Sequence, residues 1–275
     1  MIVTRQAFQK FKEVLSFKSA ATYKTYLSII NDFLLQSSLV VNEDTMLEYL
    51  KKQSPNSVMV AYYALKFFCN VVGIPFTIPH SLVAPKGHIK KCQPVLTREE
   101  IKALIDVSKK YGGTLEEGYM ALFTIYGCRR SEAYDLKPED IYEKDGNLFV
   151  KIYAKKGGQV REHLIPEFLN EFFIDFKETL GKIKKKFSVE HLNFMFTEFC
   201  KLAGITQRKR LNIHAIRRAL VSELSMIPDL HPLLVRDFLR WKPWREDIMQ
   251  VYVRYDPLTV DKMIFEKHPF LEFWK

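Results

Sequence analysis

A histidine and an arginine stand three residues apart in this sequence, at His214 and Arg217. In a helix that spacing places both side chains on one face, where they can contact a single phosphate. Arg129 and Glu132 have the same spacing, and a carboxylate there is suited to holding an arginine or a histidine in place. Guanidinium groups are planar and permanently charged, so they fit phosphate oxygens in a way that lysine does not. Either pair alone is also common on helix surfaces, so the surrounding motifs must show whether it belongs to a phosphate-binding site.

Two further segments contain groups that could act on a phosphate. Residues 154–161 read AKKGGQVR and place Lys155 and Lys156 just before a Gly-Gly turn. Residues 238–252 read FLRWKPWREDIMQVY and end on Tyr252. Pro243 would end one helix, and the acids that follow it suit the first turn of the next helix, which carries Tyr252. A phenol, a lysine and several permanent cations are therefore available in well separated parts of the chain.

In this order, the segments resemble the motifs of tyrosine recombinases, the phage integrase family. Residues 126–136, YGCRRSEAYDL, resemble the box G-x-R-x-S-E-x-x-x-L, and residues 214–218, HAIRR, resemble H-x-L-R-H/R. Residues 154–161 resemble the hairpin G-K-G-x-K-x-R, and residues 238–252 resemble L-G-H/W followed by T-x-x-Y. The spacing of four residues also resembles the opening of the family's core-binding domain: Ser19, Thr22, Tyr26 and Phe33. Residues 94–100, PVLTREE, resemble the opening of its catalytic domain. The resemblance covers nearly the whole chain, which makes it far more specific than any one short motif.

The resemblance implies a catalytic set with one phenol nucleophile: Arg129, Lys156, His214, Arg217, Trp241 and Tyr252, supported by Glu132. Tyr252 would attack a DNA phosphate to give a 3′-phosphotyrosine and a free 5′-hydroxyl, and Lys156 would protonate the leaving oxygen. A second 5′-hydroxyl would then rejoin the strands, and the reaction needs no metal, ATP or other cofactor. Neighbouring residues keep three assignments open: Trp244 for Trp241, Lys155 for Lys156 and Tyr255 for Tyr252.

The chain departs from the family pattern around its C-terminal motif. Arg240 stands where the family usually has glycine, and Met249 where it often has threonine. The interval from Trp241 to Tyr252 is also longer than usual. These departures favour a viral or plasmid integrase over a cellular Xer-like resolvase. Two other functions fit the same motifs: a type IB topoisomerase, which relaxes supercoiled DNA with a similar set of side chains, and a DNA-binding relative without catalytic activity.

The elements that must position these residues are mostly helical. Apolar residues recur at spacings of three and four through residues 1–80, which predicts a helical core-binding domain. Residues 81–95 are rich in proline and lysine and predict a basic linker, which leaves residues 96–275 as the catalytic domain. In that domain we expect a hairpin of strands at 148–153 and 160–165, and helices near 167–180, 188–203, 213–225, 231–241 and 246–254. The expected fold class is therefore mainly α with a small antiparallel β-sheet (α+β), in two domains.

The charge balance favours a polyanionic partner. Lys and Arg number 42 against 32 acids, which gives a net charge of +10, and cations that neutralise phosphates release condensed counterions. We expect double-stranded DNA as the partner, and the resemblance implies a dimer on each site and a tetramer in synapsis. Candidate contacts to the DNA backbone lie in the linker and in two basic clusters: Lys86, Lys90, Lys91, Lys184, Lys185, Arg208, Lys209 and Arg210. An ordinary solvated surface is the alternative for each group.

Several other classes of protein do not fit the sequence. There is no run of about 18 apolar residues for a membrane span and no apolar segment typical of a signal peptide, so we expect a cytoplasmic protein. The four cysteines include no C-x-x-C pair, which argues against a zinc site or a disulfide framework. The apolar tail, residues 263–275, would either dock on a neighbouring protomer, as in related recombinases, or pack against its own domain.

Overall fold

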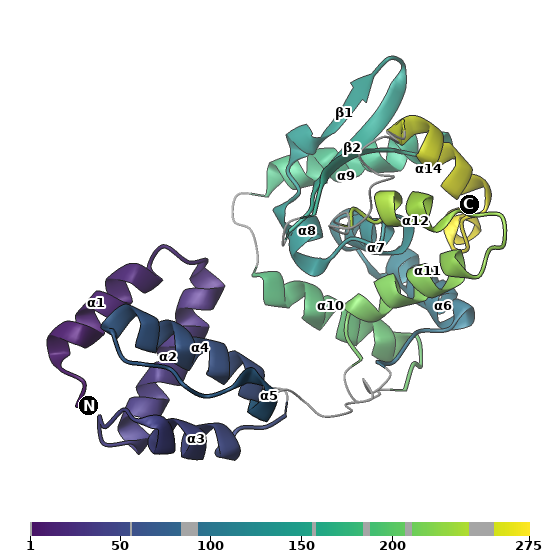
Figure 1. Ribbon diagram of the computed structural model, residues 1–275. Helices are drawn as coiled ribbons and strands as arrows, with labels where there is room; N and C mark the ends of the chain where they lie inside the picture. Colours follow the sequence, from purple (N-terminus) through teal and green to yellow (C-terminus); the bar gives the residue numbers. More distant parts are fainter. Residues whose placement is uncertain are drawn as a thin grey trace. The chain divides into compact units, whose positions relative to one another are not determined.

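The structure, a computed structural model, describes residues 2–55, 57–83, 93–155, 158–183, 188–206, 211–241 and 256–275. The chain divides into two compact units, Met1–Lys91 and Cys92–Lys275, and each unit has its own hydrophobic core. The first unit is built from helices, and the second packs helices against one small sheet that lies at its edge (Figure 1). The expected fold class, mainly α with a small antiparallel β-sheet, is confirmed.

The described part of the first unit consists of five helices. They are α1 (Arg5–Leu15), α2 (Ala20–Gln36), α3 (Glu43–Lys52), α4 (Val58–Val72) and α5 (His80–Val83). Helix α4 contacts each of the other four, and it ends at Gly73, whose φ of 76° is a conformation that glycine adopts without strain. Residues 81–83, at the start of the expected linker, belong to α5, and Val83 is buried in the core of this unit.

The second unit is organised around helix α7 (Thr114–Ile125), which is buried from Gly118 to its end. Gly118 allows close packing there, because a Cβ at this position would collide with the ring of Phe176. The other described helices are α6 (Arg98–Tyr111), α8 (Arg130–Asp135), α9 (Asn170–Lys182), α10 (Val189–Leu202), α11 (His214–Ser225), α12 (Pro232–Phe238) and α14 (Pro257–Glu266), with short 3-10 turns at Pro138–Asp140, Glu167–Leu169 and Leu271–Trp274. Helices α6, α8, α9 and α11 all contact α7, so elements far apart in the sequence meet around it.

One antiparallel sheet of three strands lies in the described part of the second unit, in the order β1-β2-β3. Strands β2 (Asn147–Tyr153) and β3 (Val160–Leu164) form the expected hairpin, with Ile152 opposite Arg161. Strand β1 (Ile141–Lys144) was not anticipated. It is joined to β2 by Asp145 and Gly146, whose φ values of 51° and 72° are typical of the two-residue turn that connects antiparallel strands. The Asp-Gly pair was therefore a sequence signal for this strand.

The helices expected near 167–180, 188–203, 213–225 and 231–241 are present as α9, α10, α11 and α12, with shifts at their ends. The first of them begins later than expected, because residues 167–169 form a 3-10 turn before α9. The last is shorter than expected, because α12 ends at Phe238 and Arg240 has a positive φ of 58°. The helix expected at 246–254 lies outside the described residues.

Candidate functional site

Arg129 lies directly before helix α8, and its position is fixed by Glu132. The Glu132 carboxylate accepts a hydrogen bond from the Arg129 backbone N–H at 2.9 Å and another from Arg129 Nη1 at 2.5 Å. The first contact caps the helix, because it satisfies a backbone donor that has no partner in the first turn. The Glu132 side chain is buried, whereas the Arg129 side chain is 28% exposed. The spacing of three thus has the expected effect: the acid holds the arginine and leaves part of its guanidinium accessible.

The first turn of helix α11 carries His214 and Arg217. Asn212 accepts a hydrogen bond from the His214 backbone N–H at 3.0 Å, which fixes the start of the helix. Arg217 is only 3% exposed. Its Nη2 donates to the Leu239 carbonyl at 2.7 Å, and its Nη1 donates to the Gly127 carbonyl. Arg217 therefore ties α11 both to the segment before Arg129 and to the end of α12.

These side chains converge on an open pocket of about 400 Å³. The lining residues are Val95, Arg129, His214, Arg217, Arg218, Val221, Ser222 and Trp241. Trp241 lies directly after α12, and its ring centre is 5.7 Å from the Arg217 guanidinium carbon. No acidic side chain lines the pocket among the residues that the structure describes. Three arginines around one open pocket suit an anion with several oxygen acceptors, such as a phosphate.

The charges around the pocket fix its protonation state. Burial disfavours the charge on Glu132, but Arg240 and Arg129 outweigh burial and lower the pKa of this carboxyl below its usual value. The protein packed around His214, and then the charges of Arg217 and Arg218, lower the pKa of this imidazole. Burial, and then Arg240 and Arg129, lower the pKa of Arg217 to about 9. At neutral pH the site therefore has a charged Glu132, a neutral His214 and a charged Arg217.

Solved structures with the same fold are site-specific recombinases and integrases. The chain superimposes on a lambda integrase dimer bound to a COC′ core site with a TM-score of 0.67 and 16% identity, over 93% of this chain and 79% of that chain. It superimposes on a lambda integrase tetramer bound to a Holliday junction with a TM-score of 0.61 and 16% identity, over 91% and 78% of the two chains. The XerH site-specific recombinase bound to palindromic difH gives a TM-score of 0.60 and 15% identity, over 79% and 72%. The chain has the tyrosine recombinase fold. No protein-family model matches the sequence, and no curated protein is significantly similar to it.

Two parts of the predicted catalytic set lie outside the described residues, namely Lys156 and Tyr252. The same holds for the alternatives Trp244 and Tyr255. Lys155 is described, and its ammonium forms an ion pair with Asp135 at the end of α8. The structure therefore brings together Arg129, Glu132, His214, Arg217 and Trp241, and the positions of the lysine and the nucleophile remain predictions.

The residues predicted to contact the DNA backbone also lie outside the described part of the chain. These are Lys86, Lys90, Lys91, Lys184, Lys185, Arg208, Lys209 and Arg210. Lys182, which precedes the second group, is described, and it pairs with Glu178 within α9 at 3.2 Å. The described helices show no segment that is long and apolar enough to cross a membrane.

Sequence reasoning missed two residues of α11 that line the pocket, Arg218 and Ser222. Arg218 Nε donates to the Pro94 carbonyl at 2.9 Å, which links α11 to the segment that precedes α6. Its signal was present, because His214, Arg218 and Ser222 follow each other at intervals of four and so share one helix face. The pocket is therefore lined by a longer stretch of α11 than the H-x-x-R motif indicates.

The apolar tail packs against its own unit in this structure. Trp274 is buried and its Nε1 donates to Thr124 Oγ1 on α7 at 3.1 Å. His268 Nε2 lies 2.9 Å from the Ile125 carbonyl, at the end of the same helix. Phe270 between them is fully buried. Of the two arrangements considered for the tail, this is packing within the domain.

Proposed function

We propose that this protein is a site-specific tyrosine recombinase or integrase, which breaks and rejoins DNA strands through a covalent phosphotyrosine intermediate. The observation that carries the proposal is the convergence of Arg129, His214, Arg217 and Trp241 on one open pocket. These residues come from separate parts of the chain, and each matches a position of the family motifs. The fold supports the same activity, since lambda integrase and XerH are DNA recombinases with this architecture.

In the proposed reaction the arginines bind the non-bridging oxygens of the scissile phosphate. Arg217 uses Nη1 and Nη2 to hold two backbone carbonyls, and a guanidinium has further N–H groups on these atoms and on Nε that can bind phosphate. Arg129 keeps part of its fork accessible while Glu132 holds the rest. The Trp241 indole N–H adds a neutral donor. Charge that develops on the phosphate in the transition state is thereby stabilised by groups that are already in place.

Tyr252 is the proposed nucleophile. A tyrosine phenol free in water has a pKa near 10, so Tyr252 must lose a proton as it attacks, and a neutral His214 can accept that proton. The new bond joins the phenol oxygen to phosphorus, and the bond from phosphorus to the 5′-oxygen breaks. Lys156 gives the leaving oxygen its proton. A 5′-hydroxyl of a second strand then attacks the phosphotyrosine, releases Tyr252 and restores a phosphodiester, so neither ATP nor a metal ion is needed.

The proposed partner is double-stranded DNA, bound by more than one protomer. The net charge of +10 favours a polyanion, and the basic residues of the linker and the two clusters are the proposed contacts to its backbone. Lambda integrase with this fold has been crystallised as a dimer on a core site and as a tetramer on a Holliday junction. A dimer on each site and a tetramer in synapsis are proposed here by analogy.

The experiment that tests this function uses duplexes of random sequence, each with a nick. Cleavage next to the nick releases a short strand that carries the 5′-hydroxyl. Without that strand the DNA cannot be rejoined, so the covalent complex is trapped. The pool is incubated with protein in the presence of EDTA, and DNA that stays attached in SDS is recovered and sequenced. We expect an adduct with the wild type and none with Tyr252→Phe. Absence of any wild-type adduct would favour the DNA-binding relative without activity. Relaxation of a supercoiled plasmid, without exchange between two copies of the recovered site, would favour the topoisomerase instead.

A further inference from the structure

Arg240 is a buried cation at the end of α12, next to the segment that contains the proposed nucleophile. It is 1% exposed and is among the largest fully buried side chains of the described residues. Its φ of 58° lies in the left-handed region, which is unfavourable for residues other than glycine. The motif of related enzymes has glycine at this position. The chain thus keeps the backbone conformation that glycine allows and adds a long charged side chain to it.

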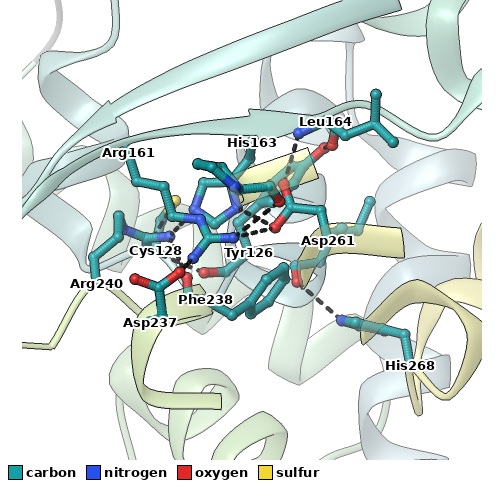
Figure 2. Close-up of polar contacts among 12 residues, drawn as sticks. Tyr126, Cys128, Arg161, His163, Leu164, Asp237, Phe238, Arg240, Asp261 and His268 are labelled. Atoms are coloured by element: carbon teal, nitrogen blue, oxygen red, sulfur yellow. Dashed lines mark hydrogen bonds and ion pairs between the residues drawn. The ribbon is translucent and has the colours of Figure 1, made fainter. Parts of the chain in front are cut away.

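The Arg240 guanidinium contacts His163 and Tyr126 (Figure 2), and it also pairs with Glu132 on α8. Its Nη1 lies 2.7 Å from His163 Nε2 on β3. Its Nη2 donates to the Tyr126 carbonyl at 3.1 Å and to Glu132 Oε2 at 3.3 Å. The Arg240–Glu132 pair is completely buried, with both side chains at 0% exposure. A buried ion pair of this kind is sensitive to the loss of either partner, because the remaining charge is left uncompensated.

His163 connects Arg240 to Asp261 on α14. Burial lowers the pKa of His163 to about 3, so its ring is neutral at pH 7. A neutral ring that accepts from Arg240 at Nε2 must carry its proton on Nδ1, where it faces Asp261 Oδ1 at 3.3 Å. Asp261 also accepts from Arg161 Nη2 at 2.8 Å and from the Leu164 backbone N–H at 2.7 Å. The chain of contacts therefore joins α14, β3 and Arg240.

The same carboxylate serves Arg240 and Arg129. Glu132 Oε2 accepts from Arg240 Nη2 and from the Arg129 backbone, while Oε1 accepts from Arg129 Nη1 at 2.5 Å. Arg240 is not among the residues that line the pocket, and its guanidinium meets Arg129 through the carboxylate that both share, that of Glu132. We propose that Arg240 is a positioning residue of the strand-transfer site, which holds Glu132 and thereby Arg129 in the geometry that binds the phosphate. This proposal rests on the proposed function.

Arg240 also contacts the base of the hairpin that carries Lys156. A Cβ added to Gly158 would lie 2.7 Å from the Arg240 carbonyl oxygen, so the hairpin backbone lies directly against Arg240. Asp261 and Arg240 lie on either side of residues 242–255 in the sequence, and His163 joins their side chains. One buried cation is thereby connected to an arginine of the pocket, to the hairpin at Gly158 and, through His163, to α14.

The test compares Arg240→Met, Arg240→Gln, Glu132→Gln and the double variant R240M/E132Q on the DNA recovered with the wild type. The rate of adduct formation is measured in a single turnover at saturating DNA, and the Kd for the same duplex is measured separately. For R240M and R240Q we expect the rate to fall about 100-fold, within the range for loss of one transition-state donor, and Kd to change by less than about threefold. The split is expected because Arg240, unlike Arg217, does not line the pocket that would receive the phosphate.

The double variant separates positioning from a loss of general stability. If Arg240 acts through Glu132, R240M/E132Q is slower than the slower single variant by no more than about threefold. The control is Leu104→Ala, which leaves a cavity where α6 packs into the core of the second unit. We expect it to lower the unfolding temperature and to keep the wild-type rate of adduct formation. R240Q keeps a polar, hydrogen-bonding group at this position and provides a second variant if R240M does not fold.

Three outcomes would overturn the proposal. One is an R240M or R240Q rate within about threefold of the wild type, and another is a double variant whose loss is the product of the two single losses. The third is a loss of rate in Leu104→Ala as large as that in R240M, since the effect would then follow stability alone. If the wild type itself forms no adduct, the proposed function fails and this inference falls with it. If the wild type forms the adduct and the Arg240 variants form it at the same rate, the proposed function stands and only this inference fails.

Discussion

Replacement of Arg217 by lysine is expected to disable the site while keeping its positive charge. Arg217 holds the Gly127 and Leu239 carbonyls with different nitrogens, and its other N–H groups remain available for a phosphate. A lysine ammonium presents all of its donors from one nitrogen. If it stays with a carbonyl it cannot also form a two-pronged contact to the phosphate, and if it moves to the phosphate both carbonyls lose their partner.

The structure allows the size of both effects to be worked out. A buried carbonyl without a partner costs about 1–3 kcal/mol of stability, and at least one of the two carbonyls loses its partner in Arg217→Lys. Loss of the fork to the phosphate is worth about 100- to 1,000-fold in rate, as for other preorganised donors. We therefore expect a lower free energy of unfolding together with a single-turnover cleavage rate that is reduced at least about 100-fold at saturating DNA.

The assay is adduct formation on the trapped duplex, with urea unfolding measured in parallel. Arg98→Lys is the matched control, because Arg98 is 44% exposed, pairs with Glu272 and lies away from the pocket lining. That variant should cleave like the wild type. The reasoning about Arg217 is refuted if Arg217→Lys retains more than about a third of the wild-type rate, since a single positive charge would then suffice.

Three further predictions concern acidity, packing and proton donation. Burial lowers the pKa values of His163 and His268 to about 3 and about 4. Below pH 6.5 these two histidines therefore bind a proton in the unfolded chain but stay neutral in the folded chain. The free energy of unfolding should therefore fall by about 1.4 kcal/mol per pH unit for each histidine as the pH drops from 6.5 towards 4. Urea unfolding of His268→Gln should show a smaller dependence of this free energy on pH. An unchanged dependence would contradict the lowered pKa of His268. Gly158→Ala would bring a Cβ to 2.7 Å from the Arg240 carbonyl oxygen, so thermal unfolding should occur at a lower temperature than in Gly181→Ala, where a Cβ meets only Pro138 Cγ at 3.8 Å; equal or greater stability of the Gly158 variant would show that the hairpin does not pack there. Lys156→Ala should cleave an ordinary duplex about 100-fold more slowly but should recover when the leaving 5′-oxygen is replaced by sulfur, which needs no proton; recovery in Lys155→Ala instead would move the general acid to the neighbouring residue.

Local patterns in the sequence predicted the hairpin and the helices α9 to α12 of the second unit, but not its central helix α7 or helix α14. The i,i+3 spacings placed His214 and Arg217 on one helix turn, and the alternation of residues 148–153 predicted the central strand. Strand β1 was missed because it is short and its Asp145-Gly146 turn was not considered. What these patterns describe are contacts between residues close in sequence, where helix and strand periodicity determine which side chains share a face.

The contacts that hold the site together were beyond such patterns. Arg240 meets His163 and Tyr126 across 77 and 114 residues, and no local spacing relates them. Its position could be noticed only as a departure from the glycine of the motif. The place of the tail was likewise undecided by composition, because its aromatic residues suit either a neighbouring protomer or the surface of α7. Only the folded chain brings Trp274 to Thr124.

Identification of the amino acid that becomes attached to DNA tests the central claim most directly. The complex trapped on the nicked duplex is digested with a protease and a nuclease, and the modified peptide is sequenced by mass spectrometry. The account predicts a nucleotide 3′-phosphate on Tyr252, in the segment that follows Trp241, and no such peptide from Tyr252→Phe. A nucleotide on Tyr255, on a serine or on any residue outside that segment would contradict it.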